Sequence, residues 1–180
     1  MVYVFLAEGF ETIEALTPVD ILRRGGVEVQ TVGVGDKTIT SSHGIPVTAD
    51  LTIDEVKTDN IEAVVLPGGM PGTLNLEKNE TVISTVKYCA ENDRLIGAIC
   101  AAPSILGHLG LLKGKKATAF PGFEKELDGA VYDSGFVEHD GLIVTARGMG
   151  VSAEFALKLL EVLKGKETAE KVHSAIQSRI

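Results

Sequence analysis

The chain has little of several features that 180 residues could contain. It has two cysteines, no tryptophan and three tyrosines, and no apolar run approaches the ~20 residues of a membrane-spanning helix. There is no Cys-x-x-Cys pair and no secretory signal, because no basic residue precedes the amino-terminal apolar run, which ends at Glu8. These features predict free thiols, a reducing cytoplasm and no membrane association.

Basic residues are also in the minority. The chain has 17 Lys and Arg against 25 Asp and Glu, a formal net charge of -8, which argues against a nucleic-acid partner. No histidine or cysteine pair has the spacing of metal ligands, and no nucleotide-binding motif has its full context, so we expect neither metal nor cofactor. The remaining composition, 44% apolar and 23% charged, predicts a single globular domain over residues 1–180.

Apolar runs alternate along the chain with segments of helical period. The expected strands are 2–6, 27–34, 63–66, 95–99 and 117–120, with a small hairpin around His43-Gly44 and another over 130–145. The expected helices are 12–24, 80–92, 101 to about 112, 150–164 and 167–177. This order predicts an α/β sandwich, a mostly parallel sheet with helices on both faces.

Cys100 follows the expected strand 95–99 directly, in a segment that reads GAICAAP. A nucleophile at a sharp strand-to-helix turn needs small neighbours, and Ala98 and Ala102 stand two residues to either side. Pro103 suits a first helical turn, and a helix N-terminus would stabilise a thiolate. A plain buried thiol explains the same residue, since cysteine is often buried, so both interpretations stay open here.

Two other strand ends supply groups that could assist a thiol. Glu14 lies in the first turns of the helix after strand 2–6, among apolar neighbours whose packing would raise its pKa. If protonated, this carboxyl could donate a hydrogen bond to a Cys100 thiolate and lower the pKa of the thiol. Gly68-Gly69 follows strand 63–66 and offers unobstructed N–H groups for an oxyanion. Glu14 could instead be a capping carboxylate, and the glycines only a tight turn.

The other thiol has a simpler interpretation. Cys89 is in phase with Val82 and Val86 on one face of the expected helix 80–92, so we expect it to pack in the core.

Several segments together resemble the ThiJ/PfpI family, in particular the branch of the Parkinson-disease-linked protein deglycase and its bacterial relatives. They follow the family order over nearly the whole chain and comprise 7–14 (AEGFETIE), 17–26 (TPVDILRRGG), 64–69 (VVLPGG), 97–103 (GAICAAP), 140–148 (DGLIVTARG) and 154–156 (EFA). The resemblance implies a flavodoxin-like fold of the class I glutamine amidotransferase type, usually as a homodimer.

By position, the resemblance makes Cys100 the nucleophile and Glu14 the carboxyl bonded to it, with Gly69 and Ala101 as oxyanion donors. The candidates for lining the site are Gly68, His43, Phe120, Arg147 and Met149. Family members are described as cofactor-free glyoxalases, deglycases, oxidative-stress sensors and chaperones.

The chain departs from the family at two positions. Many members have a histidine where this chain has Phe120, and some have an arginine where it has His43. Without that imidazole no Cys–His dyad is evident, which leaves Glu14 as the main candidate proton carrier. We therefore expect a glyoxalase III-like lyase or deglycase acting on small 2-oxoaldehydes or their adducts. The alternative is a stress sensor or chaperone in which Cys100 is oxidised to a sulfinate.

Overall fold

The computed structural model describes residues 1–178, which form a seven-stranded sheet in the order β10-β11-β7-β6-β1-β2-β5. Strand β10 runs antiparallel to β11, and the other six strands of the sheet pair in parallel. The bounds are β1 Val2–Ala7, β2 Val29–Val34, β5 Leu51–Thr52, β6 Ala63–Leu66, β7 Leu95–Ile99, β10 Val137–Asp140 and β11 Ile143–Ala146.

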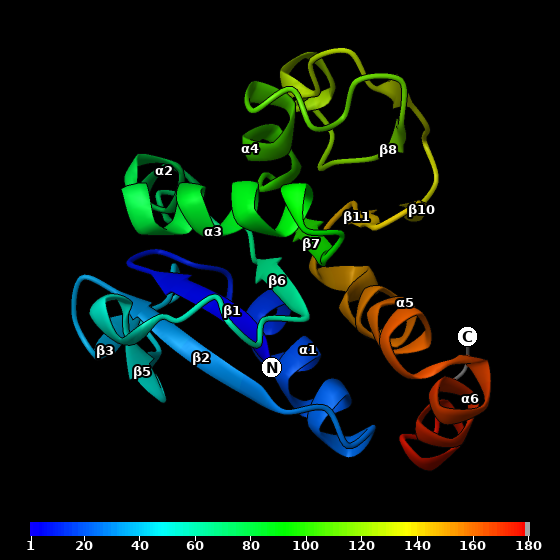
Figure 1. Cartoon of the computed structure of the whole chain (residues 1–180), viewed down its shortest axis with the longest axis horizontal. Coiled ribbons are helices and arrows are strands. Elements are labelled where there is room, and N and C mark those ends of the chain that lie inside the picture. Colours follow the sequence, from blue (N-terminus) through cyan, green and yellow to red (C-terminus); the bar gives the residue numbers. More distant parts are fainter. Residues whose placement is uncertain (179–180) are drawn as a thin grey trace.

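Helices cover both faces of this sheet, which confirms the predicted α/β sandwich (Figure 1). One face packs against α1, α5 and α6, and the other against α2, α3 and α4. The helices are α1 Thr12–Arg24, α2 Gly72–Lys78, α3 Glu80–Glu91, α4 Pro103–His108, α5 Ser152–Lys164 and α6 Lys166–Ala175. No helix within residues 1–178 is long and apolar enough to cross a membrane.

The central strands are apolar because both of their faces are covered. Every residue of β1, β6, β7 and β11 is buried, as expected for parallel strands between two helix layers. The carboxyl ends of β1, β6 and β7 then open on one edge of the sheet, where ligands bind in open α/β folds.

Small elements surround the sheet. The predicted hairpin around His43-Gly44 is present as β3 Thr38–Thr40 and β4 Pro46–Thr48. Two more short strands, β8 Lys116–Ala117 and β9 Val131–Tyr132, pair outside the main sheet. Single 3-10 turns are η1 Ile53–Glu55, η2 Glu124–Glu126 and η3 Met149–Val151.

The predicted bounds of several elements are wrong. The helix expected over 101–112 is only Pro103–His108, because residues 101–102 turn away from β7 and Gly110 takes a φ of +71° soon after. The strand expected over 117–120 is only Lys116–Ala117, the strand expected from residue 27 starts at Val29, and the 130–145 segment contains β9 as well as a hairpin. Helix α2 and strand β5 are not among the predicted elements. The run before α2 is rich in Pro and Gly, so the sequence there does not indicate the start of a helix.

Candidate active site

The elbow after β7 holds Cys100 in a left-handed conformation. Its φ is +66°, a region that costs a non-glycine residue about 1–3 kcal/mol and that recurs at active sites. Two backbone hydrogen bonds fix this geometry: Cys100 N–H donates to Ala146 (2.8 Å), and Phe120 N–H donates to the Cys100 carbonyl (2.8 Å). The thiol is partly exposed, while Ala101 and Ala102 behind it are buried.

Helix α1 carries Glu14 to the same point. Glu11 is the N-cap of this helix, and its side chain accepts a hydrogen bond from Glu14 N–H at 2.7 Å. The Glu14 side chain is only 1% exposed; Gly68 N–H donates to its Oε2 at 2.9 Å, and the Met149 backbone also bonds to it. The carboxyl shares a further hydrogen bond with the Cys100 thiol, so the structure brings this predicted pair together.

The turn after β6 leaves no room for a side chain beside this pair. A Cβ on Gly68 would lie 2.6 Å from Cys100 Cβ and 2.7 Å from Glu14 Oε2. Gly69 has a φ of +89°, which favours glycine. The backbone groups of Gly69 and Ala101 also face the Cys100 sulfur, and each lowers the pKa of the thiol. The predicted oxyanion donors therefore lie where charge would develop next to the sulfur.

Burial sets the protonation of the pair. Desolvation, above all, raises the pKa of Glu14 to about 7, and the neighbouring Glu11 charge adds to it. Burial also raises the pKa of Cys100 to about 12, and the Glu14 charge and hydrogen bond add to that. The low thiol pKa expected from a helix N-terminus is therefore not found, whereas the lowering by a protonated Glu14 carboxyl stays a prediction. Helix α4 begins only at Pro103, so its N-terminus does not offset the burial.

The two groups titrate as one unit. Between about pH 7 and pH 12 the pair holds a single proton, which can lie on sulfur or on the carboxyl. When it lies on the carboxyl, the Glu14 charge that opposes the thiolate disappears and an O–H donor faces the sulfur instead. Proton transfer within the pair would then leave a thiolate on Cys100.

The pKa of Glu14 has a consequence for stability. A carboxyl whose pKa rises from 4.5 to about 7 on folding stabilises the fold fully below pH 4.5 and loses that contribution as the pH rises through 7. The loss is about 3 kcal/mol. In chemical denaturation, we expect Glu14→Gln to gain about 3 kcal/mol relative to the wild type between pH 4.5 and pH 8. A difference that does not change with pH would contradict this prediction.

The remaining candidate residues lie at different distances from the pair. Gly68 and the Met149 backbone touch Glu14, and the Phe120 backbone touches Cys100. His43 Nδ1 shares a hydrogen bond with Ser42 Oγ at 3.1 Å, and no hydrogen bond within residues 1–178 joins His43 to the pair. The Arg147 guanidinium lies 5.7 Å from the Phe136 ring centroid and donates to the Ser134 carbonyl.

Other reactive side chains lie away from this site. Cys89 is fully buried on α3, and burial raises its pKa to about 12, as a packing thiol requires. His108 lies between Glu77 and Glu126, and its ring nitrogens are 2.5 and 3.0 Å from their carboxylates. His139 lies on β10. Residues 1–178 contain no cluster of three or more His, Cys, Asp or Glu that could hold a metal ion.

Three contributors to the site were not anticipated. Glu11 positions Glu14 as a helix cap, the Met149 amide binds the carboxyl, and the Ala146 carbonyl anchors the elbow. Glutamate is not among the residues preferred at an N-cap, so residue type does not reveal this role. The other two are backbone groups, which no residue type reveals.

The chain as a whole has relatives among known proteins. The DJ-1/PfpI family model matches residues 1–162. The chain belongs to the DJ-1/PfpI family. A solved structure named "Toxoplasma gondii DJ-1, oxidized" is 36% identical and superposes with a TM-score of 0.95, covering 99% of this chain and 98% of that one. The flavodoxin-like, class I glutamine amidotransferase-like fold is thereby confirmed.

Curated relatives extend the comparison. "Protein DJ-1 homolog A" of Arabidopsis thaliana is 39% identical over 178 residues, 97% of this DJ-1/PfpI chain. The chain spans 45% of the length of that plant relative. A Caenorhabditis elegans relative named "Glutathione-independent glyoxalase DJR-1.2" is 30% identical over 162 residues, 89% of this chain and 86% of its own length.

Proposed function

We propose that this protein is a cofactor-free glyoxalase or deglycase, which converts small 2-oxoaldehydes or their adducts to 2-hydroxy acids. One observation carries the proposal: the Cys100 sulfur stands at a strained elbow between the buried Glu14 carboxyl and the Gly69 and Ala101 backbone groups. The family includes a relative named as a glutathione-independent glyoxalase, which supports the assignment.

The first step adds the thiol to the aldehyde. Glu14 takes the thiol proton while sulfur attacks the aldehyde carbon, and a C–S bond forms as the C=O π pair moves to oxygen. The Gly69 and Ala101 backbone groups stabilise the developing oxyanion, which then takes a proton to give a hemithioacetal. A carboxyl of pKa about 7 is well matched to proton transfer near neutral pH.

The later steps move a hydrogen and add water. Glu14 removes the proton from the former aldehyde carbon and returns one to the neighbouring carbon through an enediol, which leaves a 2-hydroxyacyl thioester on Cys100. Water attacks the thioester, the C–S bond breaks and the thiol takes back a proton. In sum, 2-oxoaldehyde plus water gives a 2-hydroxy acid. One carbon is oxidised and its neighbour reduced, so no external electron carrier is needed.

Lactate formation from methylglyoxal tests the proposal. Purified protein without added thiol, metal or nucleotide should release one lactate for each methylglyoxal consumed. Mass spectrometry of a rapidly quenched reaction should find an acyl adduct on the Cys100 peptide and none on the Cys89 peptide, since Cys89 is fully buried. Lactate formation no faster than in buffer would refute the proposal.

A second function rests on the same thiol. Cys100 is partly exposed whereas Cys89 is not, and one structural relative is named as an oxidised form. Two peroxide molecules would each transfer one oxygen to the Cys100 sulfur and release water, giving a sulfinate that the Gly69 and Ala101 backbone groups can bind.

Mild peroxide treatment tests this sensor role. We expect two added oxygens on Cys100 and none on Cys89 by mass spectrometry, because oxidation follows exposure and thiolate character. Equal oxidation of both thiols, or of neither, would exclude it. The homodimer and the cytoplasmic location stay predictions.

A further inference from the structure

A hollow of about 220 Å³ opens beside the catalytic pair. Its lining is largely apolar, and Arg147 is its one charged residue. The lining comprises Phe120, Pro121, Phe136, Arg147, Gly148, Met149, Gly150 and Val151. We call this cavity the aryl hollow.

The aryl hollow is joined to the pair through short contacts. Phe120 N–H donates to the Cys100 carbonyl at 2.8 Å, and the Met149 backbone bonds to the Glu14 carboxyl. Gly148 lies between them: a Cβ on it would be 3.3 Å from the Phe120 ring and 3.8 Å from Glu14 Oε1. The hollow therefore begins one glycine away from the Glu14 carboxyl.

The side chains around the hollow are unusually apolar for their exposure. Phe120 is 48% exposed, Phe136 65% and Met149 56%. Three large apolar side chains gathered beside a reactive group are typical of a ligand surface rather than of an ordinary surface. The Arg147 guanidinium lies over the Phe136 ring and donates a hydrogen bond to the Ser134 carbonyl. These contacts hold the Phe136 ring at one side of the hollow.

The other sides of the sulfur are occupied. Glu14 and Gly68 pack against Cys100 on one side, and the Gly69 and Ala101 backbone groups bind the sulfur on another. A substrate whose carbonyl carbon is bonded to sulfur and whose oxygen faces those backbone groups must direct its substituent elsewhere. The aryl hollow is the neighbouring cavity, and its two phenyl rings and thioether match a flat aromatic group.

We propose that the aryl hollow binds the ring of an aryl-substituted 2-oxoaldehyde, so that phenylglyoxal-type compounds are the substrate class that this site selects. The inference rests on the proposed function and adds a specificity element to it. The product would be the corresponding 2-aryl-2-hydroxy acid, formed by the same balanced addition of water.

The ratio of kcat/KM for phenylglyoxal to kcat/KM for methylglyoxal tests the inference. We expect Phe136→Ala to lower this ratio about tenfold, because it removes one wall of the ring site while methylglyoxal has no ring to place. Initial rates are needed, since phenylglyoxal also modifies arginine on longer exposure.

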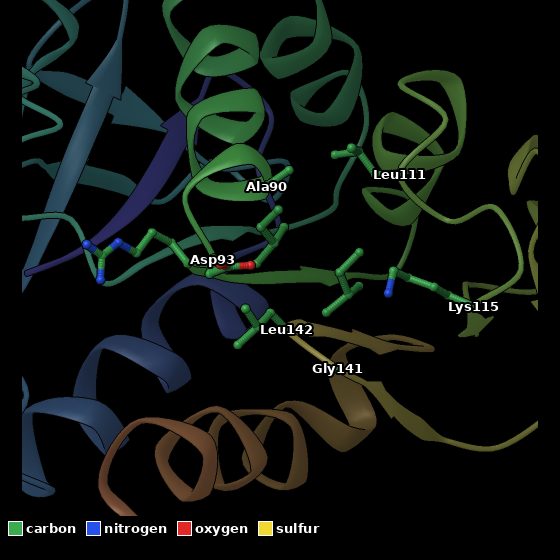
Figure 2. A pocket seen from close by; sticks show the side chains of 9 residues that line it. Ala90, Asp93, Leu111, Lys115, Gly141 and Leu142 are labelled. Carbon is green, nitrogen blue, oxygen red and sulfur yellow. The ribbon is translucent and has the colours of Figure 1, made fainter.

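Leu142→Ala is the matched control and should leave the ratio unchanged. Leu142 is a large exposed apolar residue that lines a separate hollow of about 380 Å³ (Figure 2). It precedes β11 and so lies at the amino ends of the strands, whereas Cys100 follows the carboxyl end of β7.

A second measurement separates this inference from the proposed function. Mandelate and lactate are compared for their protection of Cys100 against iodoacetamide, which requires no turnover. We expect mandelate to protect at least tenfold better in the wild type, and Phe136→Ala to remove that advantage. If neither aldehyde is converted, the proposed function fails and this protection alone decides the inference. An unchanged ratio in Phe136→Ala with active enzyme, or equal protection by the two acids, would overturn it.

Discussion

Cys100→Ala should reduce lactate formation from methylglyoxal by about 10⁴-fold or more. The sulfur is the atom that bonds to substrate, and removal of a nucleophile leaves only the weak effect of the surrounding donors. Alanine at a φ of +66° keeps the strain that cysteine already has, so the variant should fold. Circular dichroism and thermal unfolding check the fold, and a coupled lactate assay measures the rate.

Cys89→Ala provides the matched control for this substitution. Cys89 is fully buried on the apolar face of α3, so its truncation should lower stability by about 1–2 kcal/mol through the cavity that it leaves. Its turnover should stay within twofold of the wild type. Activity retained by Cys100→Ala, or lost equally in both variants, would show that the elbow thiol is not the nucleophile.

Glu14→Gln should lower kcat/KM for methylglyoxal by about 10²–10⁴-fold, the usual contribution of a positioned general base. The amide keeps the shape of the carboxyl and can still accept from Gly68 N–H, but it cannot take the thiol proton. In the wild type, activity should rise as the pH increases through about 7, because the unprotonated carboxylate is the form that accepts the proton. This inflection should be absent from the variant.

Glu8→Gln is the control for the loss of a carboxylate near α1. The Glu8 side chain accepts from Thr40 N–H at 2.9 Å and has no contact with the pair among the described residues. We therefore expect near wild-type rates and an intact inflection near pH 7. A wild-type pH profile in Glu14→Gln would show that another group carries the proton, and the proposed mechanism would then be wrong.

The sequence predicts which residues meet at this site better than it predicts their pKa values. The fully apolar runs of β1, β6 and β7 are visible in the sequence, and the rule that parallel strands end together places Glu14, Gly68 and Cys100 on one edge. The pKa of Cys100 is set by how deeply three separate elements enclose it. Such burial is a tertiary property, and a helix N-terminus inferred from one segment suggested the opposite direction.

Short helices, and exposed apolar side chains that line a cavity, are also hard to predict from the sequence. Helix α2 has seven residues after a turn rich in Pro and Gly, so its period is too brief to be distinguished from a loop. Phe136 directly precedes β10. It lines the aryl hollow because β10 pairs with β11, which is followed by Arg147 and Gly148. A single exposed aromatic in a loop carries no local signal of that placement.

At position 100, the residue that the proposed reaction needs differs from the residue that would give the most stable fold. Only glycine adopts a φ of +66° freely, so Cys100→Gly should relieve strain in the folded state. Directed evolution that selects for heat tolerance alone would thus favour loss of the side chain that we propose as the nucleophile. A library screened for both properties would hold cysteine at residue 100 and recover stability elsewhere in the fold.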